Sequence, residues 1–110
     1  DLFDQGLDFA VREWARRDEG LRARVDAADA ARLAAVASMF ERHGYSPQEA
    51  DIRARILYFM QLGYHALDQV EPLEARLARV PCYLEGFTGI APDPADVEDL
   101  AACARARALR

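Results

Sequence analysis

Residues 55–67 read R-I-L-Y-F-M-Q-L-G-Y-H-A-L, and all but Arg55, Gln61 and His65 are apolar, aromatic or small. The apolar positions recur with the period of an α-helix and do not alternate like those of a half-buried strand. On a helical wheel they cover half of the circumference or more. A surface helix needs an apolar stripe only somewhat wider than about 100°. The stretch therefore predicts a helix that is buried from two sides.

The helix has two apolar flanks. The residues of one flank are Leu57, Met60, Tyr64 and Leu67. Those of the other are Ile52, Phe59, Gly63, Ala66 and Val70, with Ile56 between the flanks and Leu62 just beyond. We expect the first two helices of the domain to cover one flank. A second copy of the chain is expected on the other, because two-fold homodimers are the commonest oligomers.

Every other long segment also has helical period, so the predicted fold class is all-α, a helical bundle domain. The expected helices span about residues 2–17, 19–43, 47–69 and 72–88, and a last one begins at residue 94. Asp18 and Ser46 are the expected N-caps of the second and third helices, and Glu49 completes a capping box with Ser46. Gly44 is expected in the left-handed conformation after the second helix. Pro81 is expected to kink or split the fourth helix.

The fourth helix supplies a second candidate for an interface. Its apolar residues step by four, three, four and three: Leu73, Leu77, Val80, Leu84 and Phe87. This is the spacing of a packing seam between helices. Two helices from each of two subunits are therefore expected to form a four-helix dimer interface. Its predicted residues are Phe59, Leu62, Gly63, Ala66, Val70, Leu77, Leu84 and Phe87.

Composition and charge exclude several classes of protein. With 52% hydrophobic and 30% charged residues among 110, the chain can build one modest core and does not resemble a disordered chain. Its net charge is −5, and its 14 basic residues, all Arg, are interspersed with acidic ones. Because no basic patch marks a phosphate footprint, we expect these residues not to bind nucleic acid by themselves.

The chain also carries few signs of location. No apolar run approaches the ~20 residues that cross a bilayer, and no signal peptide is present, so we expect no membrane partner. Cys82 and Cys103 form no C-x-x-C pair, which favours a reduced, cytoplasmic chain. Arg in place of Lys, with much Ala, is typical of a GC-rich bacterial genome. Residue 1 is Asp rather than Met, which indicates a fragment or a processed chain.

No pattern points to catalysis, a metal or a cofactor. Ser46 is explained as a helix cap, and no Glu-x-x-His pair of the di-metal bundle type occurs. His43 closes a helix, where it is expected to interact with the last carbonyls. His65 and Gln61 lie one turn apart and are either a polar edge of a ligand site or a solvated helix edge. We therefore expect a protein that is not an enzyme and needs no cofactor.

Large side chains on the flank away from the proposed dimer seam are candidates for a ligand pocket. They are Trp14, Met39, Phe40, Leu57, Met60, Gln61 and Tyr64. Gln61 is the expected orienting group, because its amide can both donate and accept. Such walls favour a small apolar or aromatic effector. The alternative is that aromatic residues at helical spacing are simply a packed core.

The sequence resembles the C-terminal part of TetR-family transcriptional regulators over about residues 7–89. The stretches that carry the resemblance are Phe9-x4-Trp14-Ala15-Arg16-Arg17-Asp18, Leu21-Arg22-x-Arg24-Val25, Ala31-Arg32-Leu33, Phe40-x3-Gly44-Tyr45-x-Pro47-x-Glu49-Ala50, Arg53-Ala54-Arg55-x-Leu57-Tyr58 with Gly63, Leu73-Glu74-x-Arg76-Leu77, and Pro81-x-Tyr83-Leu84-x-Gly86-Phe87-Thr88-Gly89. The resemblance implies an effector-binding and dimerisation domain of residues 1–90, followed by a helical tail of residues 91–110. It also implies that residues 47–69 and 72–88 are the family's two dimerisation helices.

In that family the domain follows an N-terminal helix-turn-helix that binds operator DNA, and no such motif occurs in these 110 residues. DNA binding is therefore expected only through a domain absent from this chain. The family shares no ligand motif, so the candidate pocket residues rest on the helical wheel alone. The alternative function, from a different class, is a stand-alone helical dimer that acts as an adaptor or scaffold with a fully packed core.

Overall fold

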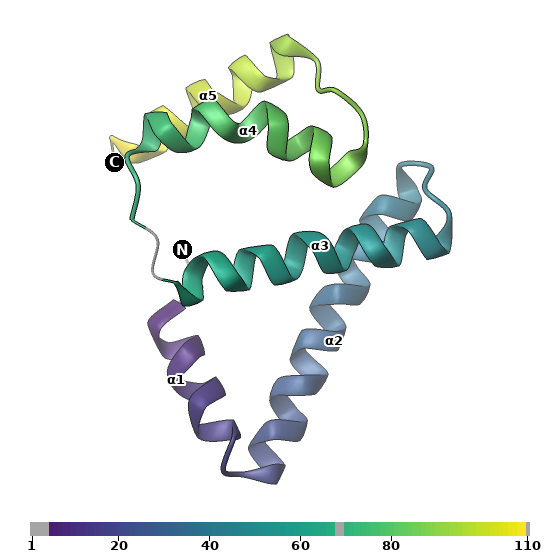
Figure 1. The fold of residues 1–110 in the computed structure, drawn as a ribbon, viewed down its shortest axis with the longest axis vertical. Coiled ribbons are helices and arrows are strands. Elements are labelled where there is room, and N and C mark those ends of the chain that lie inside the picture. The colour runs from purple at the N-terminus through teal and green to yellow at the C-terminus, as the bar shows by residue number, and fades with distance from the viewer. Residues whose placement is uncertain (1–4, 68–69, 110) are drawn as a thin grey trace. The chain divides into compact units, whose positions relative to one another are not determined.

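A computed structural model describes residues 5–67 and 70–109, and throughout these ranges the fold is all-α, without strands. Its helices are α1 (Gln5–Ala15), α2 (Glu19–Arg42), α3 (Pro47–Ala66), α4 (Leu73–Thr88) and α5 (Pro94–Ala108), as Figure 1 shows. The predicted fold class is confirmed. The third helix ends earlier than the predicted residue 69, at Ala66, with Leu67 as its C-cap. Residues 1–4, 68–69 and 110 lie outside the described residues.

Local sequence signals set most of the helix ends. The Asp18 carboxylate accepts a hydrogen bond from the Leu21 amide at 3.0 Å and begins α2. The Ser46 hydroxyl accepts one from the Glu49 amide at 3.2 Å and begins α3. Gly44 follows α2 with φ of 96°, a left-handed conformation that side chains disfavour. Both predicted caps and the predicted glycine stop are confirmed.

The fourth helix is the exception among the local signals. A split at Pro81 was one expected outcome, and it is wrong, because α4 is continuous from Leu73 to Thr88 with Pro81 inside it. Proline removes one backbone hydrogen bond from a helix. Leu77 before it and Leu84 after it are both half-buried. The helix thus continues through the proline at the cost of that one bond.

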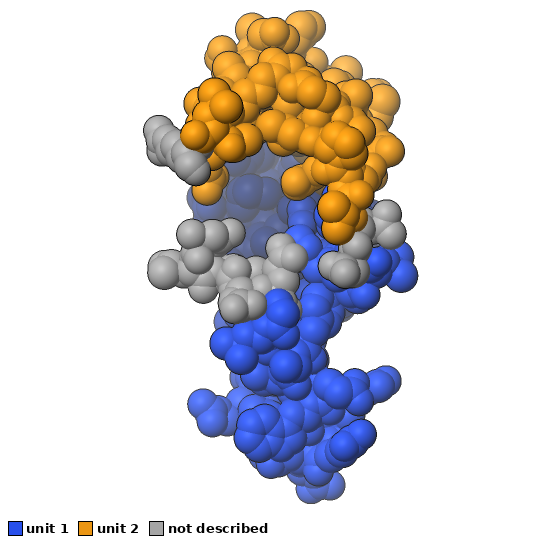
Figure 2. Space-filling view, turned by 90° about the vertical axis from the view of Figure 1, so that its left-hand side faces the viewer, with its two compact units in different colours: residues 1–69 blue, residues 70–110 orange. Residues whose placement is uncertain are grey.

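The chain divides into two compact units, residues 1–69 and residues 70–110, which Figure 2 shows in different colours. In the first unit α2 contacts both α1 and α3, and these two helices leave it from opposite ends (Figure 1). The core of this unit lies between α2 and α3. Phe40, Ala50 and Ala54 are buried there, with Val36, Ala37, Met39, Tyr45 and Leu57 packed against them. Small residues on α3 let the two helices approach closely.

The second unit is a hairpin of α4 and α5. The Arg105 guanidinium donates to both carboxylate oxygens of Glu74, at 2.8 and 2.9 Å, and so joins the last turns of α5 to the first turn of α4. Ala101 of α5 is buried. The boundary between units lies at 69/70, whereas the sequence suggested a tail that begins at residue 91. In the structure α5 packs on α4 within the second unit, and the effector-binding domain and tail implied by the resemblance stay a prediction.

None of the helices in residues 5–67 and 70–109 combines the length and the apolar character that crossing a bilayer requires.

Candidate functional site

Three of the predicted pocket residues come together in the first unit. Phe40 is only 4% exposed, and Met39 and Leu57 pack against the buried group to which it belongs. The ring of Tyr45 meets the Phe40 ring edge-on, with centroids 5.5 Å apart. These side chains fill the space between α2 and α3. The other predicted wall residues lie elsewhere on the unit.

The remaining candidates are more open. Trp14 is 65% exposed, Gln61 is exposed, and Met60 and Tyr64 are half-buried. The Tyr64 ring meets the neighbouring His65 ring edge-on, at 5.8 Å between centroids. His43 contacts a carbonyl group near the end of α2, as expected, because its Nδ1 lies 2.8 Å from the carbonyl oxygen of Met39.

The outer face of α3 is apolar and exposed, and we define it as Ile52, Ile56 and Phe59. About half of the surface of each side chain is open, 51% for Phe59. At 100° per residue this face lies opposite the buried Ala50 and Ala54. Of the first apolar flank expected from the sequence, Leu57 packs against the core, Met60 and Tyr64 are half-buried and Leu67 is exposed, whereas Ile52 and Phe59 of the second flank point outward.

The other predicted dimer residues are distributed over both units. On α3, Leu62 and Gly63 are half-buried and Ala66 is exposed. In the second unit Val70 is exposed, and Leu77, Leu84 and Phe87 of α4 are half-buried. The four-helix dimer interface stays a prediction, since it concerns a second copy of the chain.

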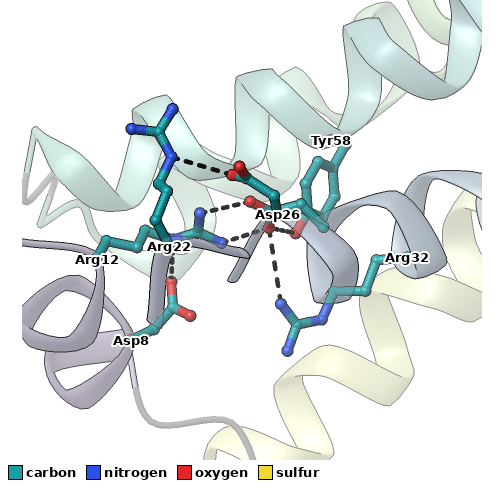
Figure 3. Close-up of polar contacts among 7 residues, drawn as sticks. Asp8, Arg12, Arg22, Asp26, Arg32 and Tyr58 are labelled. Carbon is teal, nitrogen blue, oxygen red and sulfur yellow. Dashed lines mark hydrogen bonds and ion pairs between the residues drawn. The ribbon is translucent and has the colours of Figure 1, made fainter. Parts of the chain in front are cut away.

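A set of polar contacts that we call the polar junction joins α1, α2 and α3; its residues are Asp8, Arg12, Asp29 and Tyr58. Arg12 of α1 donates to both oxygens of the Asp29 carboxylate on α2, at 2.7 and 2.6 Å. Its Nε donates to Asp8 at 2.8 Å, and the Tyr58 hydroxyl of α3 donates to Asp29 at 2.6 Å. Figure 3 shows the side chains of Asp8, Arg12 and Tyr58 converging. Arg32 lies 3.9 Å from the Asp29 carboxylate. One carboxylate thus links three helices.

The junction changes the proton affinities of its members. The hydrogen bonds from Arg12 hold the pKa of Asp29 below its ordinary value of 3.8, and the Tyr58 hydroxyl lowers it further. The pKa of Arg12 is raised, chiefly by its hydrogen bond to Asp29 and then by that to Asp8. Burial raises the pKa of Tyr58, and its bond to Asp29 adds to the rise. At neutral pH the ionised carboxylate and guanidinium are therefore both favoured.

The sequence reading missed this junction, although two signals for it were present. Tyr58 stands in the polar arc of an otherwise apolar helix, where a ring needs a polar partner for its hydroxyl. Asp8 and Arg12 form an i,i+4 pair on α1. The partner Asp29 had no local signal, because it lies 17 residues from Arg12 and 29 from Tyr58.

We expect acid to weaken the junction. A carboxylate whose pKa is lower in the folded state than in the unfolded state stabilises the fold when the pH is above the unfolded-state pKa. That stabilisation is lost as the pH drops through the folded-state pKa. For Asp29 the loss begins near the ordinary value of 3.8 and continues below it. The difference in unfolding free energy between the unmodified chain and Asp29→Asn should be constant near neutrality and shrink below about pH 4. Urea titrations from about pH 3 to 7 measure it. A difference that does not change with pH would contradict the assignment.

An open groove of about 360 Å³ lies beside the junction. It is bounded by α1 and α2, and its lining residues are Arg12, Ala15, Arg16, Arg22, Val25, Asp26 and Asp29. None of the predicted pocket residues lines it. Ala15 is buried beneath it, and the rest of the lining is mostly charged. The groove and the outer face of α3 are candidate sites among the described residues of the first unit.

Comparison with known proteins gives no match to a family model, to a curated protein or to a solved structure.

Proposed function

We propose that this chain is a dimerisation and effector-sensing domain of a transcriptional regulator of the TetR type. The observation that carries the dimerisation part is the outer face of α3, an exposed apolar row on a helix whose opposite side is already buried in the core. A two-fold dimer would cover Ile52, Ile56 and Phe59 with the same residues of a second copy. Water would then be excluded from the outer face of α3 as well as from the side that packs on α2.

The charged residues along the edge of this face suit contact with the same residues of a second copy of the chain. Arg55 and Asp51 lie beside the apolar row and form an exposed i,i+4 ion pair at 3.1 Å. Two antiparallel copies of α3 would place each arginine near an aspartate of the other copy as well as its own. Because both signs of charge are present at the same edge, the two copies meet without a row of like charges. This favours a second copy as the occupant.

We expect Phe59→Glu to convert a dimer into a monomer. A carboxylate buried at an interface without a partner costs several kcal/mol, enough to raise the dissociation constant by a hundredfold or more. Sedimentation or light scattering at micromolar concentration measures the change. Gln61→Glu is the matched control, because it adds the same charge to the same helix at an exposed position away from this face. An unmodified chain that is monomeric at these concentrations would refute the dimer.

The sensing part of the proposal follows from the resemblance and from the groove between α1 and α2. An effector bound in the first unit would favour one seating of α3 over another, with a coupling of about 1–3 kcal/mol. Operator DNA would be bound by a separate helix-turn-helix. The reading frame directly upstream in the gene tests this: it should encode about 80–100 residues with two short helices and a basic face.

As such a domain, the chain would be a sensor and not an enzyme, and it would act in the cytoplasm. Cys82 and Cys103 are both free and exposed, as thiols in a reducing compartment are. A test for location is the fraction of the chain that is recovered with cytoplasmic markers after cell fractionation.

A second candidate function is that of a helical adaptor or scaffold, and the packed group around Phe40 favours it. Met39, Phe40 and Leu57 lie together as a core. A sensor should be stabilised by the ligand that it binds, since binding to the folded state alone raises the melting temperature. Thermal melts against a library of small molecules separate the two functions: a scaffold shows no shift with any compound.

A further inference from the structure

One side of α5 is exposed and carries charges of opposite sign at its two ends. Its residues Asp96, Leu100, Cys103 and Arg107 step along the helix by four, three and four. On a helical wheel they lie within about 60° of one another. Asp96, Cys103 and Arg107 are exposed, and Leu100 is 46% exposed. We call these four residues the α5 stripe.

The stripe is distinct from the side of α5 that packs on α4. That side carries Ala101, which is buried, and Val97 and Ala104, which are half-buried. Its centre lies about 100° from the centre of the stripe on the helical wheel. Among residues 70–109 Ala101 is the only side chain classed as buried. A unit with so small a core is stabilised by any further helix that covers it.

The two charged groups of the stripe are not engaged by the part of the chain that the structure describes. Neither Asp96 nor Arg107 forms a side-chain hydrogen bond or an ion pair within residues 5–67 and 70–109. They cannot pair with each other, because residues 96 and 107 lie about 16 Å apart along a helix. Arg105 differs from Arg107 in this respect, since it is bound to Glu74. Both charges of the stripe can therefore accept a partner from outside the chain.

The helix dipole explains only part of this pattern. An acidic residue in the first turn and a basic residue in the last turn stabilise a helix, and Asp96 and Arg107 occupy those turns. The dipole has the same effect on whichever side of the helix the charges lie. A partner helix requires them on one side, and here they share the side that carries Leu100.

A second, antiparallel copy of α5 complements the stripe. With a two-fold axis midway between residues 101 and 102, residues at equal distances from the axis face each other across the contact. Asp96 of each copy then lies opposite Arg107 of the other, and Leu100 lies opposite Cys103. A parallel copy would instead bring like charges together at both ends. Charge complementarity therefore selects the antiparallel second copy as the occupant.

We propose that α5 pairs with α5 of a second copy through the stripe. The contact is small, with one leucine from each copy and two exposed ion pairs, and exposed ion pairs contribute little. It therefore rests on the proposed function for its affinity: the outer face of α3 brings two copies together, and the stripe then pairs at a high effective concentration. By itself the stripe does not hold two chains together at micromolar concentration.

Reversing the charges tests the pairing. Asp96→Arg opposes two arginines at each end of the contact, because the two-fold axis applies every substitution twice. We expect it to raise the dimer dissociation constant, measured by sedimentation, by about fivefold or more, and Arg107→Asp to do the same. An equal mixture of the two variants restores both ion pairs in a mixed dimer. That dimer should dissociate with a constant within about twofold of that of the unmodified chain.

Glu98→Arg is the matched control, because it makes the same change of charge on the opposite side of α5. It should leave the dissociation constant unchanged, and circular dichroism verifies that each variant is folded. Equal weakening by Asp96→Arg and Glu98→Arg would assign the effect to net charge and overturn the pairing. A mixture that dimerises no better than its two components would also overturn it, since an effect of the helix dipole is not rescued by mixing.

Cross-linking tests the stripe separately from the face on α3. Both charge variants also carry Cys82→Ser, which leaves Cys103 as the one thiol of the chain. Each Cys103 lies close to the proposed axis, so a short bismaleimide can join two of them. In an equal mixture at millimolar concentration, random encounters make half of the product mixed. We expect the mixed product to predominate, and mass spectrometry resolves the three products because the variants differ in mass.

The two proposals fail in different ways. A mixed product of one half overturns the stripe, whether or not the chain is a dimer. An excess of mixed product from a chain that is monomeric at micromolar concentration supports the stripe and refutes the dimer proposed through α3. A micromolar dimer that is unaffected by Asp96→Arg and Arg107→Asp supports the contact through α3 and overturns the stripe.

Discussion

Phe40→Ala is expected to lower the free energy of unfolding of the first unit by about 3–5 kcal/mol, the usual cost of removing a buried phenyl ring. Phe40 is the one large side chain among the buried residues at the contact of α2 with α3, where its neighbours are Ala50 and Ala54. Alanines cannot extend into the space that the ring leaves, so a cavity remains. Urea unfolding followed by circular dichroism measures the loss.

Trp14→Ala is the control for this prediction. It removes a larger ring, but that ring is 65% exposed, so the expected cost is below about 1 kcal/mol. A loss for Phe40→Ala as small as that for Trp14→Ala would contradict a filled core. It would instead favour an open cavity between α2 and α3, and a bound ligand should then restore the melting temperature.

Asp29→Ala is expected to cost about 2–4 kcal/mol, because it removes charge-assisted hydrogen bonds that tie three helices together. Arg12 loses both bonds to the carboxylate, and the Tyr58 hydroxyl loses its acceptor. The side chains of Arg12 and Asp29 are each 21% exposed, so water replaces the lost partners only in part. Urea unfolding again measures the loss, and the separation of α1 from α2 should appear as faster amide hydrogen exchange in α1.

Asp26→Ala is the matched control, since it removes an aspartate one turn away on the same helix. Its partner Arg22 and its own side chain are both well exposed, and the expected cost is below about 1 kcal/mol. A double-mutant cycle of Asp29→Ala with Tyr58→Phe then isolates the bond between α2 and α3. Equal losses for Asp29→Ala and Asp26→Ala would show that the junction is no more than a surface ion pair.

The sequence by itself determined the all-α class, the number of helices and most of their ends. These features depend on interactions within a few residues. Asp18 and Ser46 reach amides three residues on, and Gly44 needs only its own backbone freedom. The wide apolar surface of α3 was also a local feature, because a helical wheel places Leu57 and Phe59 on different flanks from their spacing alone.

Only the tertiary structure decided which apolar face became core and which stayed open. On α1 the inward side carries Arg12 and Ala15, while Leu7 and Trp14 lie exposed. Hydrophobicity alone would favour Leu7 and Trp14 as the inward residues, because it ranks the faces of a helix by their own composition. Here the bonds from Arg12 to Asp29, 17 residues away, orient the helix. The polar junction and the charged groove exist only once α1, α2 and α3 meet, since each is assembled from residues that are distant in the chain and have no shared local pattern.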